Sequence, residues 1–183
     1  MFNILLDEYP TEWNSYKLNT DFRVGVQMVQ ATEDKDLSDY EKLQVMVMLL
    51  FTDEHPNTEE STECIEWFLN EWNHDHHQKG GVKSMDFDVD QGRIYSAFLS
   101  QYHIDLNNTN MHFWKFMYLL SNLEECAFTR VVEIRTKKID AKMSKEEKIL
   151  YSNAKKTYAI ESEEDKQAED DTTKNFLSAL GVK

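Results

Sequence analysis

Apolar residues return every three or four positions along most of this chain, and that spacing predicts amphipathic α-helices. We expect helices over about 21–32, 38–51, 58–73, 88–102, 111–123 and 128–139, with a final one from 144 through 158. Ahead of them, apolar residues fall in two short runs around Asn14-Ser15, which indicates a small hairpin. The pattern therefore predicts an all-α fold, a compact bundle of about six to seven helices with an extended segment over 1–20.

Polar residues at the predicted helix starts supply caps. Thr20 can cap a helix that begins at Asp21, and Asp86 or Asp88 is the start signal for the helix over 88–102. In a capping box, a serine and a glutamate three residues later bond to each other's backbone N–H groups. Two such boxes occur, at Ser38-Asp39-Tyr40-Glu41 and Ser144-Lys145-Glu146-Glu147.

The apolar positions also predict which faces point inward. The first helix is expected to bury Phe22, Val26 and Val29, with Met28 on the flank of this apolar face. The second helix is apolar nearly all round at its end, which places it centrally in the core. The helix over 111–123 is the most aromatic, and we expect it at the centre of the second half, against several neighbours at once.

Composition agrees with one helical domain. Glycine (5) and proline (2) are scarce among 183 residues, so the chain lacks the residues that many tight turns require. We expect residues 1–160 to form a single helical domain with a flexible internal linker at 74–84. Residues 161–183 are acidic and poor in apolar side chains, which predicts a disordered tail, although 175–180 could form a short docking helix.

The chain has the features of a soluble protein made in the cytosol. No run approaches the roughly 20 apolar residues that cross a bilayer. The first residues lack the basic start and the long apolar segment of a secretory signal. The two cysteines, Cys64 and Cys126, are too few for a disulfide scaffold, so we expect both to be ordinary buried thiols.

The formal net charge of −14 is unevenly distributed. Residues 1–127 carry 23 acids and 8 bases, 128–160 carry 4 acids and 9 bases, and 161–183 carry 7 acids and 3 bases. An acidic body repels phosphate backbones, so nucleic acid is an unfavourable partner and other proteins fit better. The charge order also predicts a contact between the acidic tail and the basic segment.

Catalytic and metal-binding patterns are weak. His74-Asp75-His76-His77 has ligand types for zinc or nickel, but consecutive ligands without a second cluster favour a solvated linker. Asp86, Asp88 and Asp90 resemble a calcium loop that lacks the required glycine at its sixth position. Phosphate-binding glycine loops, serine elbows and CxxC pairs are absent, so we expect no enzyme and no cofactor.

Several motifs stand in order over about residues 4–160. They are Leu5-Leu6-Asp7-Glu8-Tyr9-Pro10, Tyr16, Asn19-Thr20-Asp21-Phe22-Arg23, Ile94-Tyr95-Ser96-Ala97-Phe98, Tyr102-His103-Ile104-Asp105-Leu106, His112-Phe113-Trp114-Lys115-Phe116 and Ile134-Arg135. This series resembles a family from phages and prophages of Gram-positive bacteria that is named after its "gene product fifteen" member. Where that family usually shows a second tryptophan, or a glycine before the Ile-Asp-Leu run, this chain has Phe113 and His103.

The resemblance implies a non-enzymatic tail assembly protein of the bacterial host cytoplasm, chaperone-like, whose partner is the tape-measure or tail-tube protein. A second copy of the chain, in a homo-oligomer, is a further candidate partner. Alternatives are a minor structural component of the tail and an acidic DNA-mimic inhibitor of a host DNA-binding protein. A long helical partner with apolar stripes fits a helical binding protein. The side chains expected to bind it are Phe113, Trp114, Phe116 and Tyr118 of the aromatic helix, with Ile149 and Tyr158 of the final helix.

Overall fold

The computed structural model describes residues 2–72 and 83–160. It divides the chain into two compact units, one of Met1–Gly80 with Asp90–Thr129 and the other of Gly81–Val89 with Arg130–Lys183. The predicted linker at 74–84 lies mostly outside the described residues, and the predicted tail lies wholly outside them. Folding of residues 1–160 as a single domain stays a prediction.

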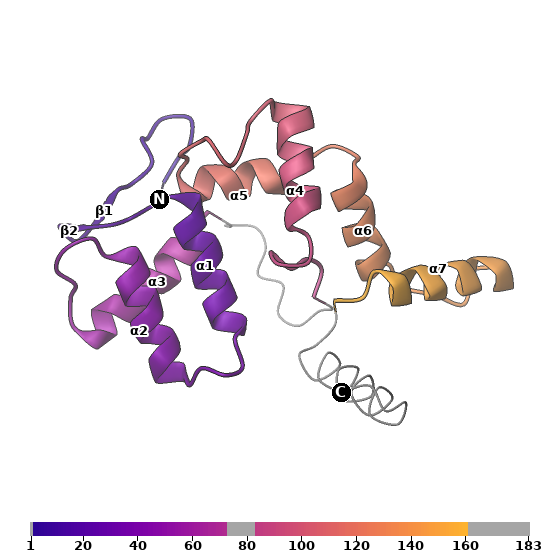
Figure 1. The fold of residues 1–183 in the computed structure, drawn as a ribbon, viewed down its shortest axis with the longest axis horizontal. Helices are drawn as coiled ribbons and strands as arrows, with labels where there is room; N and C mark the ends of the chain where they lie inside the picture. Colours follow the sequence, from indigo (N-terminus) through magenta and orange to yellow (C-terminus); the bar gives the residue numbers. More distant parts are fainter. Residues whose placement is uncertain (1, 73–82, 161–183) are drawn as a thin grey trace, which may run out of the picture. The chain divides into compact units, whose positions relative to one another are not determined.

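The fold is mainly α, as the spacing of apolar residues predicts (Figure 1). Within the described residues the helices are α1 (Phe22–Glu33), α2 (Asp39–Leu50), α3 (Thr58–Asn70), α4 (Gln91–Ala97), α5 (Phe113–Ser121), α6 (Ala127–Thr136) and α7 (Lys145–Thr157), and a π-helical turn, η1 (Phe98–Tyr102), continues α4. None of these helices is long and apolar enough to cross a membrane.

The predicted N-terminal hairpin is confirmed. Strands β1 (Glu12–Trp13) and β2 (Tyr16–Lys17) pair antiparallel around Asn14 and Ser15, whose φ angles of 45° and 73° lie in the left-handed region that such a turn uses. The chain after the hairpin is fixed to the end of α2, because the Asn19 N–H donates to the Leu50 carbonyl at 2.7 Å.

Both capping boxes form as expected, at Ser38 before α2 and at Ser144 before α7. The prediction for α1 is wrong by one residue. Asp21 is the cap, because its carboxylate accepts from the backbone N–H of Arg23 at 3.0 Å, while the Thr20 carbonyl accepts from the Phe113 N–H at 2.8 Å.

The helix expected over 88–102 starts later than predicted. Asp86 accepts the N–H groups of Asp88 and Val89, which holds the chain in a turn there. The helix begins only after Asp90, the residue before α4. An aspartate that can bond the next N–H groups favours either a turn or a cap, and the sequence alone did not separate the two.

In the first unit, α1 lies beside α2, α2 contacts α3, and α5 packs against α1 (Figure 1). This arrangement corrects two predicted faces. Phe22 and the flanking Met28 are buried on α1 as expected. Val26 and Val29 are only half-buried, because contact with both α2 and α5 buries Val24, Gly25 and Ala31 instead. The end of α2 is not buried all round, since Met48 is 81% exposed.

Candidate protein-binding surface

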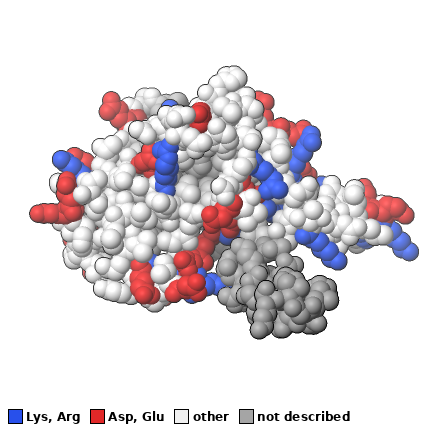
Figure 2. All heavy atoms as spheres, viewed as in Figure 1, with Lys and Arg blue, Asp and Glu red and all other residues white. Residues whose placement is uncertain are grey.

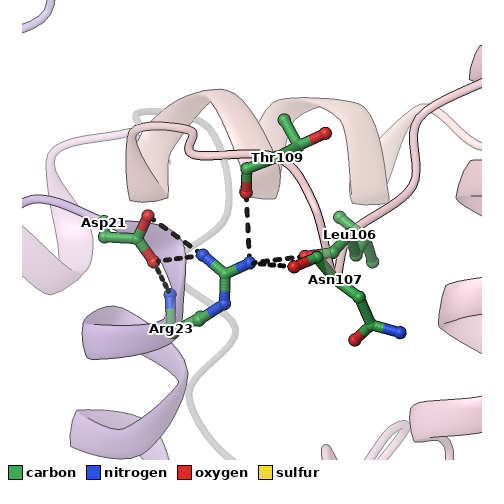
Figure 3. Close-up of polar contacts among 5 residues, drawn as sticks. All are labelled: Asp21, Arg23, Leu106, Asn107 and Thr109. Atoms are coloured by element: carbon green, nitrogen blue, oxygen red, sulfur yellow. Dashed lines mark hydrogen bonds and ion pairs between the residues drawn. The ribbon is translucent and has the colours of Figure 1, made fainter.

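The N-terminus of α1 is fixed to the loop before α5 by one arginine (Figure 3). The Arg23 guanidinium pairs with Asp21 at 3.1 Å and donates to the carbonyl oxygens of Leu106 at 2.6 Å and Thr109 at 3.2 Å. Bonds to a charged donor are stronger than neutral ones, and these cross more than eighty residues of sequence. Two motifs that are distant in the sequence, around Asp21 and around Leu106, therefore meet at a structural junction.

His112 joins the N-terminal segment to α5. As the cap of α5, its Nδ1 accepts from the Trp114 N–H at 3.1 Å, so Nδ1 carries no proton and Nε2–H donates to the Pro10 carbonyl at 3.0 Å. The ring of Tyr9 stacks on it with centroids 4.8 Å apart. Burial lowers the pKa of His112 more than the bond to Pro10 raises it.

The aromatic side chains of α5 form the core of the first unit. Phe113, Trp114 and Phe116 are buried, and the Trp114 indole donates to the Phe68 carbonyl at 2.7 Å. Phe116 stacks between Phe22 and Phe98, with centroid distances of 4.8 and 5.1 Å. In this state these three predicted binding residues present no surface to a partner.

Tyr118, the fourth predicted binding residue on α5, is half-buried. Its ring meets the edge of Trp72 with centroids 6.3 Å apart. Burial, with a smaller contribution from Glu71, raises its pKa, so the phenol stays neutral at ordinary pH. It can therefore donate a hydrogen bond at the rim of the core.

The second unit is organised by a buried arginine that the sequence analysis did not single out as a site. Arg135, in the last turn of α6, donates from Nε to the Tyr158 carbonyl at 2.6 Å and from Nη1 to the Ser84 carbonyl at 3.2 Å. Lys155 returns a bond to the Arg135 carbonyl at 2.6 Å. The C-terminal end of α7 is thus fixed to the end of α6, and this accounts for the half-buried position of Tyr158.

The N-terminal half of α7 extends away from α6 (Figure 1). Its apolar side chains Ile149 and Leu150 are 62% and 66% exposed. Tyr151, on the packed side, lies under the Lys137 ammonium at 5.1 Å. Of the six predicted binding residues, Ile149 is the one that the structure leaves exposed, and Leu150 joins it as a neighbour that the sequence analysis missed.

Other exposed apolar side chains lie in the first unit. Leu5 and Leu6 project from a turn in which the Asn3 carbonyl accepts from the N–H groups of Leu6 and Asp7. Tyr40 and Met48 stand two turns apart on the outer face of α2. These exposed apolar side chains can serve as controls for substitutions of Ile149 and Leu150 on α7.

Two aspartates of the candidate calcium loop, Asp86 and Asp90, are engaged with basic side chains of the protein. Lys83 pairs with Asp86 at 2.6 Å, and Arg93 pairs with the buried Asp90 at 2.9 Å. Burial opposes ionisation of Asp86, but the bonds from Lys83, Val89 and Asp88 together lower its pKa. Residues 74–77, the candidate zinc or nickel ligands, lie outside the described part of the chain.

The thiols differ from one another. Cys64 is fully buried, and burial raises its pKa to about 12, so it stays protonated. Cys126 is only half-buried, which corrects the expectation that both thiols are buried. Its N–H and carbonyl bond the Thr129 hydroxyl, at 2.8 and 3.1 Å.

Charge differs between the two units. On the face drawn in Figure 2, mostly acidic side chains with a few basic ones lie over the first unit, and basic side chains lie on α6 and α7 beside several acids. The lysines of α7 are Lys145, Lys148, Lys155 and Lys156. The exposed apolar pair of α7 is therefore set among positive charges, as the charge count of residues 128–160 indicates.

Comparison with known proteins gives one family match. Residues 4–160 match the family model described as Bacteriophage Gp15 protein. A search of curated proteins gave no match, and a search of solved structures gave none either.

Proposed function

This chain belongs to the Bacteriophage Gp15 protein family, and on that premise we propose that it is a phage or prophage tail assembly protein that acts by protein–protein binding. In this proposal it is a chaperone-like factor for the tape-measure or tail-tube protein. The family match spans nearly the whole of the described chain, so both units belong to the family pattern. The tail-assembly role rests on what the resemblance of the motifs implies.

The observation that carries the binding role is the exposed apolar pair of α7. Ile149 and Leu150 are exposed on the N-terminal half of α7, and the C-terminal end of this helix is fixed by Arg135. Covering a large aliphatic side chain gains roughly 1.5–3 kcal/mol. A tape-measure protein is a long helical chain with apolar stripes, and such a stripe fits an exposed apolar helix face.

The core position of the α5 aromatics narrows the proposed surface. Contact with a partner through Phe113, Trp114 or Phe116 would require α5 to leave the core, since each is almost wholly buried. The surface that we propose is therefore Ile149 with Leu150, whereas Tyr158 is half-buried at the other end of α7. Lysines on the same helix favour a partner segment that carries acidic residues near its apolar stripe.

The experiment is co-purification of the tape-measure or tail-tube protein with the full chain and with an Ile149→Ser/Leu150→Ser variant. Loss of two covered aliphatic side chains is expected to weaken binding by at least about tenfold, since each tenfold is about 1.4 kcal/mol. The control is Met48→Ser, which removes a still more exposed apolar side chain, 81% exposed, from α2. Equal recovery with all three chains would contradict this placement of the surface.

Mass spectrometry of purified virions tests the chaperone part of the proposal separately. An assembly factor is expected to be absent from the finished particle. Its presence at a fixed copy number would instead make the protein a minor structural component of the tail. The co-purification result does not decide this point, because both roles require a bound partner.

A further inference from the structure

The C-terminal segment, residues 161–183, combines two features that the proposed function does not use. Seven of its residues are acidic and three are basic, and these acids lie between 161 and 171. Its apolar residues follow as a cluster at Phe176, Leu177 and Leu180. The segment is thus acidic first and apolar second, and three residues separate it from the end of α7, the helix with the exposed apolar pair.

The outer face of α7 has the complementary pattern. Lys145, Ile149 and Lys156 are exposed and stand four and seven residues apart, so they lie along one side of the helix with Leu150 adjacent. Glu146 is an acid on this face, whereas Glu147 is engaged with the Ser144 N–H at 2.8 Å. The face therefore offers two apolar side chains flanked by ammonium groups.

We propose that the C-terminal segment binds back on this outer face of α7. Phe176, Leu177 and Leu180 cover Ile149 and Leu150, while the acids pair with Lys145 and Lys156. A partner for the same face must then displace the segment before it binds. The displacement step rests on the proposed function, but the contact itself does not depend on it.

The lengths permit this contact. Nine residues of helix separate Ile149 from Tyr158, a distance of about 14 Å at 1.5 Å per residue. From Ile160 to Phe176 the chain has sixteen residues, which can span up to about 50 Å. A segment tethered so close to its site has an effective concentration of the order of millimolar, so weak contacts suffice to keep it bound.

The anchoring of α7 makes the face available to this segment. Arg135 donates to the Tyr158 carbonyl, and Lys155 donates to the Arg135 carbonyl. The C-terminal end of α7, from which the chain continues, is therefore fixed in position. The half of the helix that carries Ile149 stays clear of α6. The segment therefore starts beside its site, on the same unit.

The test is methyl NMR on the full chain at low and high concentration. With isoleucine δ1 methyls labelled, the Ile149 signal is identified by its disappearance in an Ile149→Val variant. A Phe176→Ser/Leu177→Ser variant is expected to shift the Ile149 methyl and to leave the methyls of Ile4 and Ile94 in the first unit unchanged. Raising salt is expected to shift it in the same direction, because screening weakens the acid–lysine pairs.

Two outcomes overturn the proposal. One is an Ile149 methyl that is indifferent both to the Phe176→Ser/Leu177→Ser change and to salt. The other is a shift that appears only as concentration rises, which would assign the face to a second copy of the chain. Neither outcome depends on a tail protein being present, so failure here is distinct from failure of the co-purification experiment.

A binding measurement then tests displacement. If the segment competes with the tape-measure or tail-tube protein, the Phe176→Ser/Leu177→Ser chain binds that protein more tightly than the unaltered chain. Unchanged affinity, together with a shifted Ile149 methyl, would keep the contact and remove its role in competition.

Discussion

Position 25 shows how closely α1 and α5 approach. An added Cβ at Gly25 would overlap the ring of Phe113, which is itself buried. We predict that Gly25→Ala destabilises the protein by roughly 1–3 kcal/mol, although alanine is the better helix former. Urea unfolding measures this change.

Gly92 supplies the matched control for that substitution. It also lies in a helix, α4, but a Cβ there meets nothing within 4 Å. Gly92→Ala is therefore expected to stabilise by up to about 1 kcal/mol. Stabilisation by both variants would mean that Phe113 moves aside at little cost, which would contradict the prediction for Gly25→Ala.

His112 makes stability depend on pH. Its neutral form is needed because Nδ1 accepts the Trp114 N–H, and the pKa in the folded state lies below the usual value of about 6.5. A lowered folded pKa means that its contribution is complete above pH 6.5 and is lost as the pH falls through the folded pKa. We predict a lower free energy of unfolding at pH 5.5 than at 7.5.

A change of pH acts on the whole chain, so the contribution of His112 needs a variant for comparison. Asparagine caps helices well and does not titrate. His112→Asn is expected to show a smaller loss of stability between pH 7.5 and 5.5 than the unaltered chain. Equal losses would assign the pH dependence to other groups.

The backbone conformation at His103 gives a reason why the family usually has glycine at this position. Its φ of 55° and ψ of 30° are left-handed, the conformation in which glycine has no Cβ penalty, and the family usually has glycine before the Ile-Asp-Leu run. We predict that His103→Gly stabilises by up to about 1 kcal/mol, since relief of a roughly 1–2 kcal/mol strain exceeds the added unfolded-state entropy. Thermal unfolding measures it, and a lower Tm would contradict it.

At the scale of single elements, local chemistry predicted most of the helices. Both capping boxes and the Asn14-Ser15 turn form because each depends on residues within a few positions of one another. One error was local, the turn at Asp86 before α4, and others arose where distant residues decide. Asp21 caps α1 while the Thr20 carbonyl bonds α5, and a histidine that caps α5 is fixed by Pro10, a hundred residues earlier.

Arg135 gives a prediction for α7 as an element. Arg135→Met removes charged donors from the carbonyls of Tyr158 and Ser84, and a hydrogen bond to a charged group contributes about 1.5–3 kcal/mol. Amides near the C-terminal end of α7 are expected to exchange hydrogen at least about tenfold faster. Lys138→Met, at an exposed position just after α6, is the control and should leave these rates unchanged.

At the scale of the whole molecule, the candidate surface was predicted only in part. The aromatic run of α5 has the composition of both a core and a binding face, and burial against α1, α3 and η1 decided for the core. Ile149 stood out in the sequence as a sparse apolar position on a charged helix. Arg135 fixes the C-terminal end of α7 and leaves the half with Ile149 exposed. No pattern of neighbouring residues indicates this arrangement.

The single-domain prediction can be tested by unfolding. The four tryptophans, Trp13, Trp67, Trp72 and Trp114, all belong to the first unit, whereas helix content comes from both units. The division between the units falls within α6, so we expect fluorescence and far-ultraviolet circular dichroism to give coincident urea transitions. Separate midpoints would show that the units unfold independently.

The junction around Arg23 and the outer face of α7 differ in what a substitution would disturb. The motifs in which this chain resembles the family include Asp21, Arg23, Leu106 and His112, and in this structure they are engaged with one another or with the core. The outer face of α7 contains none of them. If the protein binds as proposed, substitutions at a few positions of this one short helix would change its partner without disturbing the framework.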